Sequence, residues 1–142
     1  NMLHEMGFGV VIPDQIGFGK SSKPIDYQYS FEALAQNTKG LLEHLHIDSV
    51  HVIGHSMGGM LAARFALLYP SMTKEVTLLN PLGLENYLRD GKSSIEEIRE
   101  ISDCEIFLDL KLHDIPATVA GACRSVADLN PKDGLLTQHQ SG

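Results

Sequence analysis

The stretch that most constrains the fold is residues 50–68, where a short apolar run leads through Gly54-His55-Ser56-Met57-Gly58 into a second apolar stretch. The β-branched residues of Val50–Ile53 favour a strand, and Met57–Leu68 favours a buried helix, because it is apolar nearly all round. A serine between two glycines at a strand-to-helix junction is the sequence form of a nucleophile elbow. The alternative is an ordinary tight turn that contains a serine.

An elbow of this kind makes specific demands on its neighbours. The sharp turn predicts that a Cβ at Gly54 or Gly58 would collide with nearby backbone. We expect Ser56 to be strained, with its Oγ exposed at the N-terminus of the following helix. There the helix dipole and the N–H of Met57 would stabilise an anion that develops on a substrate carbonyl.

Strands and helices alternate along the chain, which predicts an α/β fold. We expect a single three-layer domain over residues 1–142, with a mostly parallel five-stranded sheet and helices on both faces. Strands are expected at 8–13, 50–53, 75–80, 104–112 and 135–140. Helices are expected at 31–46 after an N-cap at Ser30, at 57–68 before Pro70, at 94–101 with Ile95, Ile98 and Ile101 inward, and at 116–129.

The composition excludes several classes of function. A net charge of −7 with only 11 Lys and Arg argues against a nucleic-acid partner, which needs a basic face. No apolar run is long enough to span a membrane, and no signal segment opens the sequence, so we expect a soluble protein of the reducing cytoplasm. Cys104 and Cys123 are interpreted as small core residues, and the histidines show no metal-ligand spacing. We therefore expect neither a metal nor a cofactor.

Several motifs together resemble the α/β-hydrolase superfamily over about residues 6–88. They are PDQIGFGKSSKP at 13–24, GHSMGG at 54–59, ALLYP at 66–70 and LLNPLGLENY at 78–87. The resemblance implies that Ser56 is the nucleophile, and that a base and an orienting acid follow it along the chain. In that family another strand lies between the strands at 8–13 and 50–53. Since that strand is missing, we expect 8–13 to pair directly with 50–53, or a strand from the second half to fill the gap.

The second half resembles a different family. FLDLKLHDIP at 107–116 is similar to the signature of orotidine 5′-monophosphate decarboxylase, a TIM barrel, over about residues 98–142. That resemblance implies that Lys111 protonates the carbon that loses CO₂, that Asp109 and Asp114 set its charge, and that Asp114 reaches across a dimer interface. The alternative is a solvated ion-pair cluster. Two families in one chain predict a chimera, designed or recombined, with halves 1–88 and 89–142.

Neither set of catalytic residues is complete in this sequence. After the elbow, His113 and His139 are the only histidines, and His113 with Asp109, Asp114 or Asp14 is the candidate base for Ser56. Three hypotheses stay open. The favoured one is a hybrid domain without efficient catalysis, and the others are a weak serine esterase acting on a small ester and residual decarboxylase-like or phosphate-ligand binding. A homodimer is compatible with the last of these.

Overall fold

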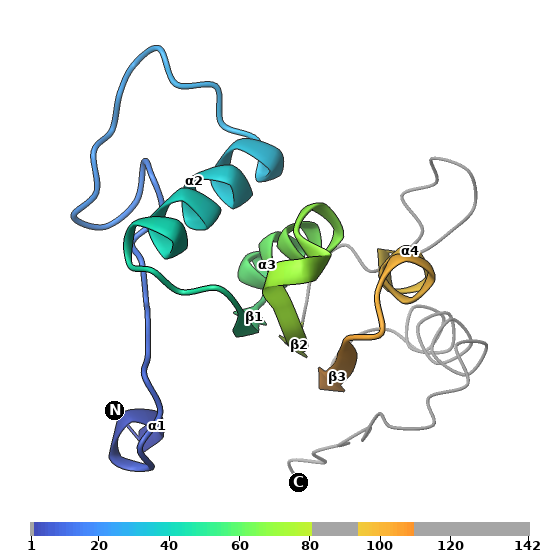
Figure 1. The fold of residues 1–142 in the computed structure, drawn as a ribbon. Helices are drawn as coiled ribbons and strands as arrows, with labels where there is room; N and C mark the ends of the chain where they lie inside the picture. Colours follow the sequence, from blue (N-terminus) through green and yellow to red (C-terminus); the bar gives the residue numbers. More distant parts are fainter. Residues whose placement is uncertain (1, 81–93, 110–142) are drawn as a thin grey trace, which may run out of the picture.

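The computed structural model of the protein describes residues 2–80 and 94–109 (Figure 1). The first of these ranges begins with a short helix, and the second ends with a strand. In chain order the elements are α1 (Met2–Glu5), α2 (Phe31–His44), β1 (Val50–His55), α3 (Met57–Leu68), the 3-10 helix η1 (Pro70–Met72), β2 (Thr73–Leu79), α4 (Ser94–Ile101) and β3 (Glu105–Asp109). The predicted helix at 116–129, the predicted strand at 135–140 and Cys123 lie outside the described residues.

The described strands form one parallel sheet in the order β1-β2-β3. Val52 lies opposite Val76, which lies opposite Ile106, so that apolar side chains on neighbouring strands share a face. The α/β class and the parallel sheet are therefore confirmed. Of the five predicted strands, three are present in the described ranges.

Helices α3 and α4 cover one face of this sheet, and α2 packs against α3 (Figure 1). The core lies between them because small residues on α3 let this helix approach the strands closely. Its buried members include Ala62, Ala63 and Ala66 of α3, Val76 and Leu78 of β2, Ile95 and Ile98 of α4, and Ile106 and Leu108 of β3. Along β3, Ile106 and Leu108 are buried two residues apart, as expected for one face of a strand.

Local signals place the helix ends close to the predicted positions. The Oγ of Ser30 accepts a hydrogen bond from the backbone N–H of Ala33 at 3.1 Å, so Ser30 is the N-cap of α2 as predicted. Helix α3 ends at Leu68, and after Tyr69 the proline Pro70 begins η1, so the helix stops before this proline as predicted. These signals act within a few residues, which is why the sequence alone predicts them well.

The strand predicted at residues 8–13 is wrong. These residues are in neither a helix nor a strand, and Phe8 and Ile12 expose 55% and 77% of their surface. An apolar β-branched run becomes a strand only when another strand is beside it to share hydrogen bonds. Direct pairing of 8–13 with β1 is therefore wrong as well, and β3, from the second half, pairs with β2 on its far side from β1.

The predicted burial of one residue of α4 is also wrong. Ile95 and Ile98 are buried as predicted, whereas Ile101 is 51% exposed. Three-residue steps fall behind the helical repeat by about 60° each, so the third isoleucine turns away from the face of the first. The helix ends at Ile101. An apolar residue four positions after Ile98, rather than three, would have been needed to return to the buried face of the helix.

Candidate nucleophile elbow

Ser56 occupies the sharp turn between β1 and α3. Its backbone has φ 54° and ψ −121°, a conformation that residues other than glycine rarely adopt. The turn is held on both sides by backbone hydrogen bonds. The N–H of Ser56 donates to the carbonyl of Leu79 on β2 at 3.0 Å, and its carbonyl accepts from the N–H of Gly59 at 2.9 Å. The predicted strained serine at a strand-to-helix junction is therefore present.

The two glycines of the motif have different roles. A Cβ added at Gly54 would collide with the carbonyl oxygen of Gly58 and would lie 2.6 Å from the Gly58 carbonyl carbon and 2.8 Å from the Ala62 Cβ. A Cβ added at Gly58 would meet nothing within 4 Å. The predicted collision is confirmed at Gly54 and wrong at Gly58, because Gly58 provides the backbone that approaches and its own Cβ direction is open.

The N-terminus of α3 provides donors beside the serine. Met57 is the first residue of this helix, so its N–H belongs to the first turn, whose amides have no acceptor within the helix. The Ser56 side chain does not cap the helix, and the first turn holds no acidic residue. An anion that forms next to the half-buried Ser56 would therefore meet free amide donors and the positive end of the helix dipole.

The other predicted site residues are divided between the described and undescribed parts of the chain. Asp109 is the last residue of β3 and lies in register with Leu79, which in turn lies in register with His55 next to Ser56. The chain therefore brings Asp109 to the same end of the sheet as the elbow, two strands away. His113, Lys111, Asp114 and His139 lie outside the described residues.

Asp14, the third candidate acid, is used by its own loop. Its Oδ2 accepts a hydrogen bond from the backbone N–H of Lys20 at 2.9 Å, and its carbonyl accepts from the hydroxyl of Ser21. Gly19 passes so close that an added Cβ would lie against the Asp14 carboxylate. These contacts give Asp14 a structural role in closing the loop.

One polar pair was not predicted. The Nδ1 of His51 on β1 lies 3.1 Å from the Oε2 of Glu75 on β2, on the sheet face opposite α3. Both side chains are partly exposed, with 59% and 34% of their surface accessible. The signal that was available is the register of the two parallel strands, which cannot be read before their pairing is known.

The remaining polar residues form no further centre in the described ranges. Among residues 2–80 and 94–109, no cluster of three or more His, Cys, Asp or Glu could hold a metal ion. Cys104 is a free thiol that packs, partly buried, against the core cluster of α3 and the strands, in agreement with its interpretation as a small core residue. In the same ranges, no helix has the length and apolarity to cross a membrane.

A parallel sheet in which one strand turns through a strained serine into a buried helix defines the class of α/β proteins that carry a nucleophile elbow. The chain belongs to the α/β hydrolase family. The model of this family, described as the alpha/beta hydrolase fold, matches residues 1–127.

Individual relatives agree with this assignment. The chain is 30% identical over 101 residues to 2-hydroxy-6-oxo-2,4-heptadienoate hydrolase of Pseudomonas putida, which covers 66% of this chain and 37% of the relative. It is 41% identical over 78 residues to 2-hydroxy-6-oxo-6-phenylhexa-2,4-dienoate hydrolase of Burkholderia cepacia, covering 55% of this chain and 27% of the relative. A solved structure of a probable hydrolytic enzyme from Pseudomonas aeruginosa superposes with a TM-score of 0.65 at 26% identity, over 89% of this chain and 67% of that one.

A second similarity confirms the resemblance to decarboxylases. Over 61 residues the chain is 57% identical to orotidine 5′-phosphate decarboxylase of Thermobifida fusca. The matched stretch covers 43% of this chain and 25% of the relative. The chain therefore spans between about a quarter and two fifths of the curated relatives named here, with shares of 25%, 37% and 27%.

Proposed function

We propose that this protein is a hybrid α/β domain that presents the nucleophile elbow of a serine hydrolase, with Ser56 as a vestigial nucleophile that lacks efficient turnover. The observation that carries the proposal is the backbone of Ser56, held at φ 54° between β1 and α3. A strained serine needs a reason to persist, because its conformation costs about 1–3 kcal/mol. Placing a nucleophile beside the amides at the N-terminus of α3 supplies one.

Turnover is proposed to be inefficient because the serine needs a precisely held base. A serine hydroxyl is a weak nucleophile until an adjacent group takes its proton. The candidate base, His113, belongs to the motif that resembles the decarboxylases, whereas Ser56 belongs to the hydrolase motif. A catalytic group must be held within about 0.5 Å of its productive position, and two unrelated halves have no common origin for such a fit.

The test separates reactivity from turnover. A fluorophosphonate probe should label the protein slowly at Ser56, and labelling should be absent in Ser56→Ala. Steady-state hydrolysis of p-nitrophenyl acetate and of 2-hydroxy-6-oxo-6-phenylhexa-2,4-dienoate, chosen from the name of a relative, should equal that of Ser56→Ala. Hydrolysis that exceeds this control at least tenfold would contradict the proposal.

The first alternative is a weak carboxylic-ester hydrolase, favoured by the complete geometry of the elbow. Ser56 would attack the ester carbonyl, the N–H of Met57 would stabilise the oxyanion, and His113 would take the proton. Under this alternative His113→Ala should remove the same share of ester hydrolysis as Ser56→Ala. If only Ser56→Ala loses activity, His113 has no part in the reaction.

The second alternative is residual decarboxylase-like chemistry or binding of a phosphate ligand, favoured by the 57% identity to a decarboxylase. Asp109, Lys111 and Asp114 would provide the site. Calorimetric titration with uridine monophosphate should then show heat that Lys111→Ala abolishes, and a titration without heat would exclude the alternative.

We also propose that the stretches 1–88 and 89–142 form one domain. Two contacts support this proposal: β3 pairs with β2 in one sheet, and α4 packs against α3. The net charge of −7 supports a protein without a nucleic-acid partner, and we propose a cytoplasmic location. A single cooperative unfolding transition of the full chain would agree with one domain, and two separate transitions would not.

A further inference from the structure

The carboxyl end of β2 is followed by a residue in a left-handed conformation. Asn80 comes directly after β2, has φ 41° and lies in a bend. Among the described residues other than glycine, His46 and Ser56 also have a positive φ. Asparagine and histidine enter this region more readily than most residues, whereas β-branched side chains are almost excluded from it. The conformation of Asn80 therefore needs a physical explanation.

The positive φ of His46 has a local explanation. This residue lies just past the end of α2, and the N–H of the next residue, Ile47, donates back to the carbonyl of Leu42 at 2.9 Å. Helices commonly end with one left-handed residue held by such a bond. Asn80 follows a strand, so this explanation does not apply to it.

Asn80 shares a peptide group with the carbonyl that holds the elbow. The N–H of Ser56 donates to the carbonyl of Leu79 at 3.0 Å, and this carbonyl belongs to the peptide between Leu79 and Asn80. The bond continues the pairing of β1 with β2 by one step, because His55 is the last residue of β1 and lies in register with Leu79. Since the peptide is planar, the φ of Asn80 sets its orientation relative to the chain that follows.

This hydrogen bond matters because Ser56 is itself strained. A strained residue persists only where its surroundings hold it firmly in place. Two backbone bonds hold Ser56: its carbonyl accepts from Gly59 in α3, and its N–H donates to Leu79 across the sheet. The first bond stays inside the turn and its helix, so the second ties the turn to the neighbouring strand. If the Leu79 carbonyl moved away, the φ of Ser56 would be free to relax.

We propose that Asn80 is a positioning residue for Ser56. Its left-handed backbone ends β2 beside the serine and turns the chain out of the strand direction, while the Leu79 carbonyl stays directed at the elbow. A residue that prefers the extended region would pull this peptide out of its place. The inference rests on the proposed role of Ser56 as a nucleophile, because a misplaced hydroxyl would react more slowly with an electrophile.

Fluorophosphonate labelling of the full chain tests this role. Asn80→Val should slow the labelling of Ser56 at least about tenfold, because a β-branched side chain disfavours a positive φ. Asn80→Gly allows φ 41° freely and should label within about twofold of wild type. His46→Val is the matched control, since it places the same strain before the start of β1, at the opposite end of this strand from the elbow.

The labelling rates distinguish the backbone of Asn80 from its side chain. If Asn80→Gly and Asn80→Val slow labelling equally, the side-chain amide is the group that matters, and the proposal is wrong. An equal effect of His46→Val would overturn it as well, because general strain would then explain the loss.

Amide hydrogen exchange by NMR tests the position of Ser56 without any chemistry at its hydroxyl. In Asn80→Val the N–H of Ser56 should exchange at least about tenfold faster relative to the amide of Leu78, and in Asn80→Gly this ratio should match wild type. Leu78 is fully buried on β2, between β1 and β3, so the ratio accounts for a general loss of stability.

The exchange ratio also separates this inference from the proposed function. If wild-type protein is not labelled at all, the proposed function fails, and the ratio alone decides whether Asn80 positions Ser56. An unchanged ratio in Asn80→Val would overturn the positioning role. If Asn80→Val does not fold, Asn80→Ala is compared with Asn80→Gly in the same way, because alanine also carries the Cβ that disfavours a positive φ.

Discussion

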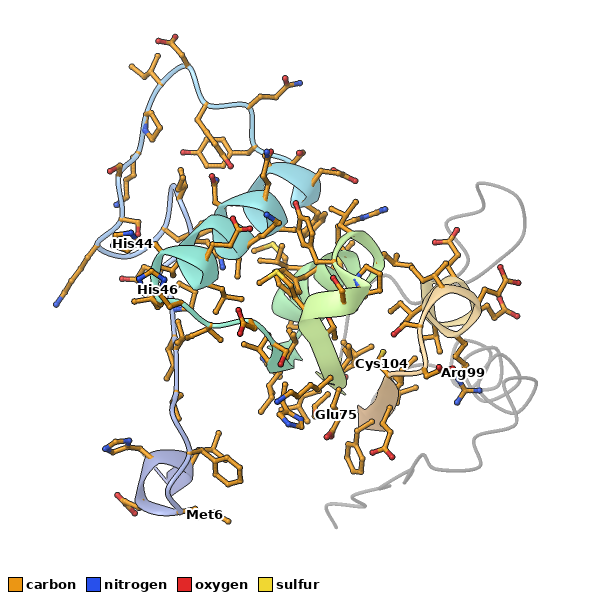
Figure 2. All side chains as sticks on the ribbon, in the orientation of Figure 1. Met6, His44, His46, Glu75, Arg99 and Cys104 are labelled. Atoms are coloured by element: carbon orange, nitrogen blue, oxygen red, sulfur yellow. The ribbon has the colours of Figure 1, made fainter. Side chains whose placement is uncertain are left out.

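The elbow and the segment at residues 8–13 both belong to motifs of one family, yet only the elbow has its predicted structure. Around the elbow, β1 is paired with β2 and covered by α3, and all three lie within thirty residues of chain, 50–79. Residues 8–13 have an equally apolar, β-branched sequence but lie outside the sheet, with Ile12 exposed by 77%. Figure 2 shows the same contrast: side chains gather around α3 and are sparse along the segment that leads to Met6.

The difference shows that an apolar segment forms a strand only when a neighbouring strand pairs with it. Propensity and apolar pattern are similar in the two segments, and the neighbour is what differs. For β1 the neighbour follows directly through α3, whereas 8–13 is separated from β1 by a long loop and α2. Four pairs of substitutions test how far this explanation holds.

The largest difference is expected between apolar residues of the two regions. Leu78→Ala on β2 removes a fully buried side chain and should lower the free energy of unfolding by about 2–5 kcal/mol. Ile12→Ala should change it by less than about 0.5 kcal/mol, because Ile12 is already in contact with water. Urea unfolding followed by circular dichroism measures both. A comparable loss at Ile12 would mean that residues 8–13 pack against the domain, and the contrast would then disappear.

A smaller effect is expected within the elbow itself. Gly54→Ala forces a Cβ against the Gly58 backbone and should cost about 1–3 kcal/mol of unfolding free energy. Gly58→Ala places its Cβ in open space near the start of α3, and should be neutral or stabilising by up to about 1 kcal/mol. The same unfolding experiment compares the two, and equal losses would contradict the close approach at Gly54.

Because Ser56 is strained, its replacement by glycine should raise the stability of the protein while the reactive hydroxyl is lost. Ser56→Gly removes the Cβ that disfavours φ 54° and should raise the free energy of unfolding by about 1–2 kcal/mol. Ser56→Ala retains a Cβ and should leave the stability nearly unchanged. Both variants should lose fluorophosphonate labelling, so stability separates them where reactivity cannot. A glycine variant no more stable than the alanine variant would show that the turn is unstrained.

These contrasts also explain how much of the molecule could be predicted from its sequence. The elbow, the caps and the helix order depend on contacts between near neighbours, and they are confirmed at Gly54, Ser56 and Ser30. The pairing of 8–13 and the His51–Glu75 pair depend on register or on distant neighbours. A single sequence contains no direct signal for either, which is why the first prediction was wrong and the second was not made. The error at Ile101 has a local cause, because the helical repeat turns this residue away from the face of Ile95. The base for Ser56 has the same difficulty as the pairing of 8–13, since α3, β2, α4 and β3 lie between Ser56 and His113 in the sequence.

The smallest effect is expected at Ser30, where local sequence alone determines the structure. Ser30→Ala removes the hydrogen bond from the N–H of Ala33 to Oγ and should cost about 1 kcal/mol of unfolding free energy. Ser30→Asp is the matched control, since aspartate also caps helices and its charge favours the positive end of α2, so its stability should equal or exceed wild type. A cap acts within its own helix turn, so the loss should be the same in the wild type and in the Leu78→Ala variant. If the cost of Ser30→Ala instead changes in the Leu78→Ala variant, then the start of α2 and the core at β2 are coupled, and even this local signal depends on distant contacts.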